Sequence, residues 1–142
     1  MVIAFIGDGG KVDEKSVIRE IHSFLSIVMN HYNIDACYLC NEVEFDLVAL
    51  KVVEYAKKNQ PHIKSILFPL PDSTEYNQSL YDKVQMIDLD KVPIDYAKIL
   101  RNEYMIKECD ILVLHERYSC DITDVFRAKA FAKALKKTVY EV

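Results

Sequence analysis

The chain has 142 residues, of which 51% are hydrophobic and 28% charged, and its formal net charge is −4. This length and apolar content suit one domain over residues 1–142 with a single core. An acidic chain lacks the basic surface that nucleic acids and anionic membranes attract, so we expect neither as a partner. No apolar stretch approaches the ~20 residues of a membrane span, and the first residues lack the pattern of a secretory leader. We therefore expect a cytoplasmic protein.

The four cysteines are too few for a disulfide scaffold in a chain of this size. Cys37 and Cys40 have CxxC spacing, but they lie in an apolar run that reads as a strand. Residues three apart on a strand point to opposite faces, so this pair could neither form a disulfide nor share a metal. We interpret both as core residues, with metal or redox use as the alternative, and expect no metal site and no resident cofactor.

Apolar runs alternate with helical patterns along the whole chain. The expected strands cover residues 2–6, 36–40, 62–68, 111–115 and 139–142. The expected helices cover residues 14–28 with Asp13 as cap, 45–58, 93–109 beginning with Pro93, and 125–137 with Asp121 or Thr123 as cap. Residues 72–91 contain turn residues and then a short helix around 78–84. This alternation predicts right-handed βαβ crossovers in an α/β, three-layer Rossmann-like domain with a mainly parallel five-stranded sheet.

All three glycines lie together, at Gly7, Gly9 and Gly10, directly after the first expected strand. An apolar β-branched run that breaks into Gly-x-Gly-Gly and then a capped helix is typical of the first turn in a nucleotide-binding sheet. The spacing differs from that of the dinucleotide fingerprint and of the P-loop. The alternative is a tight strand-to-helix turn without a ligand.

Ligands of such sheets bind beyond the carboxyl ends of the strands, where the strand order reverses. The strand order 3-2-1-4-5 would bring Asp8 and the glycine turn beside His115 and Arg117. It would place Asn41 and Glu42 on the flank of the same crevice.

Four polar residues are candidates for binding a nucleotide. Asp8 and Asp46 could accept hydrogen bonds from ribose hydroxyls, although Asp46 also suits the dipole of a helix N-terminus. Arg101 is the best phosphate ligand because its guanidinium makes bidentate contacts, with Asn102 beside it. A surface or structural ion pair, with Glu103 as its neighbour, is the alternative for this arginine.

Two further candidates follow the fourth expected strand. His115 has an intrinsic pKa that suits acid–base chemistry, or it is an ordinary residue at a strand end. Arg117 is a second candidate phosphate contact. A cluster of tyrosines could stack on a base but more often packs at an edge or interface; its members are Tyr76, Tyr81, Tyr96 and Tyr104.

Three segments resemble the YpsA-like branch of the SLOG superfamily, Rossmann-like proteins related to Smf/DprA and to the cytokinin-activating LOG enzymes. They are Phe5-Ile-Gly7, Asn41-Glu-Val-Glu-Phe-Asp46, and Arg101-Asn102-x-Tyr-Met-Ile followed by Cys109-Asp110. The resemblance implies a Rossmann-like fold whose glycine-rich turns hold a nucleotide-like ligand. The chain departs from the branch at Gly7-Asp8-Gly9, at Val43-Glu44 and at Ser119-Cys120-Asp121, where the branch has Gly-His-Arg, two glycines and a glycine pair.

The sequence leaves three functions open. The first is a binding or regulatory protein for a nucleotide or nucleotide derivative, held by the glycine turn, Arg101 and an acidic ribose contact. The second is an N-glycosidic or phosphoribosyl hydrolase that uses Asp46 or Glu42, although the Pro-Gly-Gly-x-Gly-Thr-x-x-Glu run of the LOG enzymes is absent. The third is a degenerate member of the superfamily that acts through protein contacts, for example as a homodimer.

Overall fold

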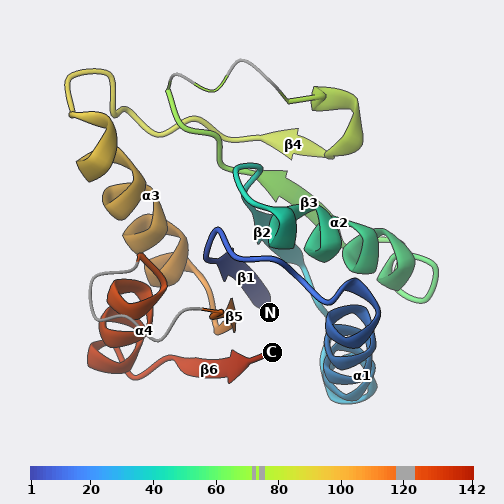
Figure 1. Ribbon diagram of the computed structural model, residues 1–142. Coiled ribbons are helices and arrows are strands. Elements are labelled where there is room, and N and C mark those ends of the chain that lie inside the picture. Colours follow the sequence, from blue (N-terminus) through green and yellow to red (C-terminus); the bar gives the residue numbers. More distant parts are fainter. Residues whose placement is uncertain (72, 74–75, 118–123) are drawn as a thin grey trace.

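A computed structural model describes residues 1–71, 73, 76–117 and 124–142 as a parallel sheet with helices on both faces (Figure 1). The elements in chain order are β1 (Val2–Gly7), α1 (Glu14–His31), β2 (Ala36–Leu39), α2 (Glu44–Ala56), β3 (Lys64–Leu67), η1 (Gln78–Leu80), β4 (Lys83–Val84), α3 (Ile94–Glu108), β5 (Ile111–His115), α4 (Asp124–Ala134) and β6 (Thr138–Glu141). The expected α/β three-layer, Rossmann-like fold is confirmed.

Within the described residues the sheet has six strands in the order β4-β3-β2-β1-β5-β6, and every neighbouring pair is parallel. The expected order of five strands is confirmed, but the number five was wrong. The additional strand, β4, lies at the edge, where a short helix over 78–84 was expected. A strand of two residues has no period for a sequence pattern to reveal. It is held beside β3 by Asp82, whose carboxylate accepts a hydrogen bond of 2.8 Å from the backbone N–H of Ser65.

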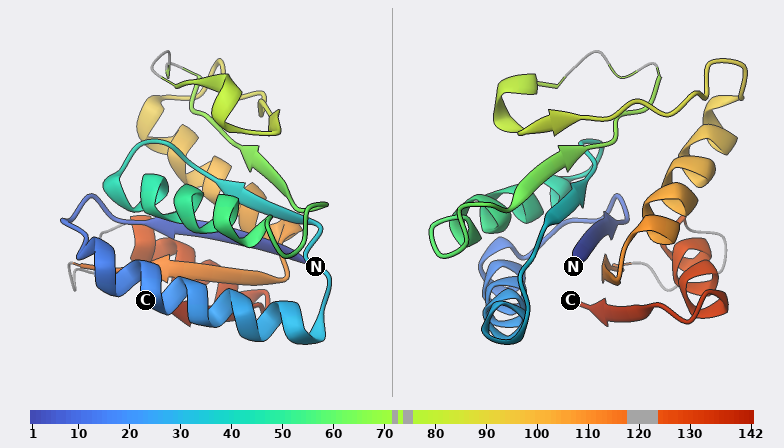
Figure 2. Two further views of the ribbon diagram at one scale, coloured as in Figure 1. Left: turned by 90° about the vertical axis from the view of Figure 1, so that its right-hand side faces the viewer. Right: turned by 180° about the vertical axis from the view of Figure 1, so that it is seen from behind.

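The two faces of the sheet are covered by different helix pairs. Figures 1 and 2 show α1 and α2 on one side and α3 and α4 on the other. Alternate residues of β1 enter the two cores: Ile3 and Phe5 pack with α1 and α2, whereas Ala4 and Ile6 pack with α3 and α4. This period of two is the geometry of a strand that is buried on both faces.

The cysteines follow the same alternation. Cys37 lies in the core under α1 and α2, and Cys40 lies in the core under α3 and α4. Both are free and buried, so their interpretation as core residues is confirmed.

Helix ends differ from the expected ones by a few residues. Asp13 caps α1 as expected, while Pro93 stands at the N-cap of α3, one residue before the helix begins. α4 ends before residue 137 because Lys136 has a φ of 57°, which is the left-handed conformation that terminates helices. Asp121 and Thr123, the expected caps of the last helix, lie outside the described residues, as do Ser119 and Cys120.

No helix in the described part of the chain has the length and apolar character needed to cross a membrane.

Candidate functional site at the carboxyl edge of the sheet

The strands β1 and β5 end side by side at the point where the strand order reverses. Gly7 pairs in register with His115, and the backbone N–H of Asp8 donates a 3.1 Å hydrogen bond to the carbonyl of His115. The structure therefore brings the glycine turn and the residues after β5 together, as the expected strand order requires.

The carboxylate of Asp8 accepts backbone hydrogen bonds from both sides of this junction. Its Oδ1 accepts from the N–H of Gly10 at 3.0 Å, and its Oδ2 accepts from the N–H of Arg117 at 2.5 Å. Asp8 is 7% exposed. The side chain that was expected to contact a ribose thus occupies the position between two backbone amides that an external anion would otherwise take.

The three glycines of the turn are in different surroundings. A Cβ atom on Gly7 would lie 2.6 Å from the ring of Phe45, and one on Gly10 would lie 2.5 Å from the Cβ of Arg117. A Cβ atom on Gly9 would meet nothing within 4 Å. None of the three has a positive φ. Close packing therefore requires glycine at two positions, and Gly9 is the one that borders open space.

His115 is buried against Phe45 of α2. The two rings stack with centroids 5.2 Å apart and an interplanar angle of 13°. Burial lowers the pKa of His115 below its ordinary value, so the imidazole is neutral at pH 7. Among the described residues, nothing within hydrogen-bonding distance pairs with its buried Nδ1.

Arg101 reaches the same edge from α3 and is held by acceptors of this chain. Its guanidinium forms an ion pair with the carboxylate of Glu42. It also donates to Asn102 Oδ1 at 3.0 and 3.2 Å and to the carbonyl of Phe68 at 3.4 Å. Arg101 is only 2% exposed. Burial alone would lower the pKa of Arg101, but nearby negative charge that includes Glu42 raises it above the ordinary value.

The carboxylates of Glu42 and Asp46 organise the segment that leads into α2. Glu42 Oε2 accepts from the N–H of Asn41 at 2.7 Å. Asp46 Oδ2 accepts from the N–H groups of Glu42 and Val43 at 2.8 and 2.9 Å, which satisfies donors at the helix start. Burial raises the pKa of Asp46 to about 6, because it outweighs the opposite effect of these hydrogen bonds.

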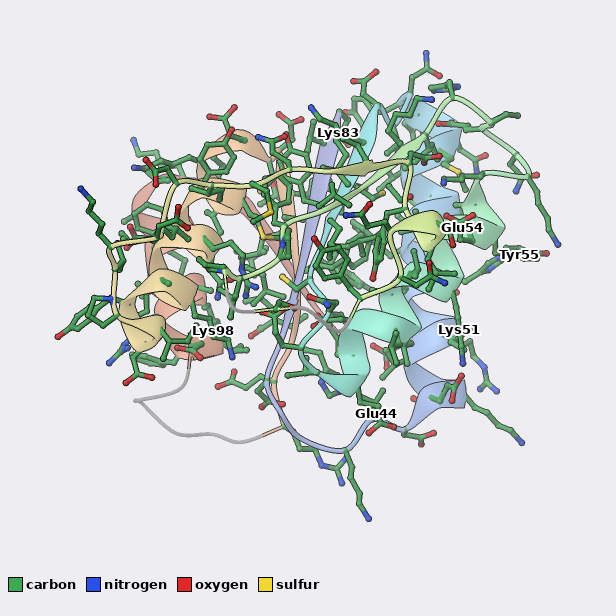
Figure 3. All side chains as sticks on the ribbon, turned by 90° about the horizontal axis from the view of Figure 1, so that it is seen from above. Glu44, Lys51, Glu54, Tyr55, Lys83 and Lys98 are labelled. Atoms are coloured by element: carbon green, nitrogen blue, oxygen red, sulfur yellow. The ribbon has the colours of Figure 1, made fainter. Side chains whose placement is uncertain are left out.

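A small pocket lies between these groups. It is lined by Ile6, Gly7, Cys40, Glu42, Val43, Asp46, Lys98, Arg101 and Asn102. Its interior leaves about 10 Å³ for the centre of a water molecule, which is about the room that one water needs. Figure 3 shows two labelled residues near this edge, Glu44 at the start of α2 and Lys98 on α3, on opposite sides of the sheet.

A wider pocket, with a volume of about 410 Å³, opens beside the start of α2. Asn41 and Glu42 form its border with the sheet edge. Of the candidate binding residues, Asn41 lines this space. Asp46 lies in the first turn of α2, and the other candidates lie along the junction of β1, β5 and α3.

Several contacts of the site were not predicted from the sequence. Glu42 was placed on the flank, but it is the partner of Arg101, where Glu103 had been considered. Phe45 was part of the family resemblance, but nothing in its sequence context indicated its stacking on His115. No cluster of three potential metal ligands occurs in the part of the chain that the structure describes.

Comparison with known proteins does not assign the chain to a family. No protein-family model matches its sequence, and no curated protein matches it at a significant level.

Proposed function

We propose that this protein binds a nucleotide-derived small molecule at the carboxyl edge of its sheet. The observation that carries the proposal is a pair of buried polar atoms at that edge. Among the described residues, Asn41 Oδ1 and His115 Nδ1 are the buried side-chain atoms without a hydrogen-bond partner. Each such atom costs about 1–3 kcal/mol, and a ligand with suitably placed donors would offset that cost.

Two further features support this location. The edge lies at the reversal of strand order, which is where Rossmann-like sheets bind ligands. Gly9 leaves open space beside the turn, so a ligand could approach the backbone there. The resemblance of three segments to the YpsA-like branch of the SLOG superfamily favours a nucleotide derivative over other small molecules.

A thermal-shift screen tests the proposal. Nucleotides, nucleosides, ADP-ribose and cyclic dinucleotides are each added to the purified protein. A ligand at one hundred times its Kd stabilises the folded state by about 2.7 kcal/mol, which gives a clear rise in Tm. A null result with every class would overturn the proposal.

The variant Asn41→Ala tests whether the ligand binds at this edge of the sheet. Its amide makes one weak contact, a 3.4 Å hydrogen bond from Nδ2 to Ser73 Oγ, so the fold should tolerate the change. Arg101→Ala is unsuitable as a site variant because this buried arginine has four hydrogen bonds within the protein. A thermal shift that is lost in Asn41→Ala would locate the ligand at this edge.

Hydrolysis of an N-glycosidic bond is the second candidate. The observation that favours it is Asp46, whose pKa of about 6 suits proton transfer near neutral pH. Asp46 also lines the water-sized pocket together with Arg101. Release of free base from nucleoside monophosphates, lost in Asp46→Asn with folding unchanged, would support hydrolysis over binding alone.

Protein contact is the third candidate. Three apolar side chains are exposed along α3: Ile94 is 48% exposed, Tyr96 64% and Leu100 42%. Such a surface would suit a homodimer or another protein partner. A monomeric mass in light scattering at high protein concentration would count against the homodimer.

A further inference from the structure

The sheet ends at β6, whose outer side we call the β6 edge (Figures 1 and 2). β6 is last in the strand order and, among the described residues, pairs only with β5. The N–H of Val142 donates a 2.9 Å hydrogen bond to the carbonyl of Leu114 on β5. Because successive residues of a strand turn their backbone groups to opposite sides, Tyr140 also faces β5, whereas Val139 and Glu141 face outward. The outward N–H and C=O groups have no hydrogen-bond partner in the described part of the chain.

The β6 edge lacks two features that protect other sheets from pairing with a second chain. Open edges are often blocked by proline or by unpaired charges. The strand Thr138–Glu141 contains no proline, and its single charge is that of Glu141. This carboxylate is already paired with Lys129 of α4 at 2.5 Å. An incoming strand therefore meets free backbone groups and no uncompensated charge on β6.

A second copy of this chain can satisfy all the outward groups of β6 in one antiparallel register. Val139 of one copy then lies opposite Glu141 of the other, and both pairs exchange N–H and C=O hydrogen bonds. A register with Val139 opposite itself would need the N–H of Lys137, which already donates to Ala132. A register with Glu141 opposite itself would bring like charges together. The first register is symmetric about a two-fold axis, as a closed dimer requires.

Side chains on the α1 face of the β6 edge favour the same occupant. In this register the two copies of Tyr140 lie directly opposite each other, where cross-strand aromatic pairs stabilise a sheet. Within each copy Tyr140 already stacks on Phe24 of α1, with ring centroids 4.4 Å apart. Ile27 lies three residues after Phe24, on the adjoining face of the helix, and is 62% exposed. A second copy would cover this exposed isoleucine.

We infer that β6 pairs antiparallel with β6 of a second copy of this chain, so that one continuous sheet runs through a symmetric dimer. The hydrogen bonds between Val139 and Glu141 set the register, and Tyr140 and Ile27 add apolar contact between the copies. The β6 edge differs from the exposed face of α3 and from the proposed ligand site. The inference therefore does not depend on the ligand.

Analytical ultracentrifugation at rising protein concentration tests the inference. The wild type should pass from monomer to dimer. Val139→Pro should raise the dimer Kd by about tenfold or more, because proline removes an outward N–H that makes no bond to β5. Ile27→Lys should also weaken the dimer. Leu100→Lys is the matched control, since Leu100 is 42% exposed on α3, and it should dimerise like the wild type.

Amide hydrogen exchange gives a readout that needs no variant. The amides of Val139 and Glu141 should become protected as the wild type dimerises, because their N–H groups then bond to the second copy. The amide of Val142 bonds to Leu114 within each copy and should be protected at every concentration.

Three results would overturn the inference. The first is a monomer at every concentration. The second is fast exchange at Val139 and Glu141 in a dimeric sample. The third is a dimer that Leu100→Lys weakens and Ile27→Lys does not, which would assign dimerisation to α3. If circular dichroism shows that Val139→Pro does not fold, Ile27→Lys and the exchange rates decide the question.

Discussion

The imidazole of His115 lies parallel to the ring of Phe45, with centroids 5.2 Å apart, and thereby joins the end of β5 to the start of α2. Phe45 also fills the space where Gly7 lacks a side chain. One aromatic ring thus connects three of the segments that form the carboxyl edge. The geometry of this edge depends on packing as much as on polar contacts, and the predictions below test both.

The stacked histidine should titrate below its ordinary range. Burial lowers its pKa from 6.5, so the unfolded chain binds the proton more tightly than the folded one. Stability from this group is therefore complete above pH 6.5 and is lost as the pH falls below it. NMR titration of the His115 ring should give a midpoint below 6.5 in the wild type and a higher one in Phe45→Ala. A wild-type midpoint at or above the ordinary value would contradict the burial argument.

Asp46 should have the opposite pH dependence. Its pKa rises from 3.8 to about 6 on folding, so the folded state binds this proton more tightly. Stability from Asp46 is present below the unfolded pKa and is lost as the pH rises through 6, by about 3 kcal/mol in all.

Asp46→Asn isolates that contribution because an asparagine oxygen can still accept the N–H groups of Glu42 and Val43. Urea denaturation at several pH values should show the wild type losing stability relative to this variant between pH 4 and pH 7. The control is Glu44→Gln, which removes an exposed charge from the same helix turn. Parallel pH profiles for wild type and Asp46→Asn would refute the raised pKa.

Alanine substitutions at the three glycines of the turn should change the free energy of unfolding by very different amounts. Alanine at Gly7 or Gly10 places a Cβ atom 2.6 or 2.5 Å from a neighbouring side-chain atom, and such overpacking costs about 1–3 kcal/mol. Alanine at Gly9 meets nothing within 4 Å and should leave stability unchanged or raise it by about 0.4–1 kcal/mol. Equal losses at all three positions in chemical denaturation would be inconsistent with this packing.

Removal of the Arg101 side chain should destabilise the fold. Arg101→Met leaves the carboxylate of Glu42 and the oxygen of Asn102 without their donor, and breaking a buried ion pair costs about 3–5 kcal/mol. The double variant Arg101→Met/Glu42→Gln should recover part of that loss. Arg127→Met, at an exposed arginine on α4, serves as the control and should stay within about 0.5 kcal/mol of the wild type. A loss at Arg101 below 1 kcal/mol would indicate that the guanidinium is available to a ligand.

Short-range patterns in the sequence predicted the framework of the fold. The β-branched run before Gly7 and the apolar spacing of the helices predicted β1 and α1, and the alternation of strands with helices predicted a parallel sheet. β4 could not be predicted, because its two residues are held at the edge by Asp82 and Ser65, which lie 17 residues apart.

The partners within the site depend on tertiary structure and were less predictable. Asp8 and His115 were correctly placed side by side, since the expected strand order puts the ends of their strands next to each other. Arg101 lies on a helix, and its position relative to them did not follow from the strand order. The pairing of Arg101 with Glu42 spans 59 residues, and no local pattern distinguishes that partner from the adjacent Glu103. The backbone contacts of Asp8 likewise depend on β5 lying beside β1, so its carboxylate could be interpreted from the sequence only as a ribose contact.

The most direct test of binding at the carboxyl edge uses the glycine region of a ¹H–¹⁵N correlation spectrum. The chain has only three glycines, and all lie in the turn after β1, so their backbone amide signals report on this edge alone. Titration with a nucleotide derivative that raises Tm in the thermal-shift screen should shift these three signals, together with that of Asn41, in a saturable way. Glycine signals that stay in place throughout a titration with each class of nucleotide derivative would contradict binding at this edge.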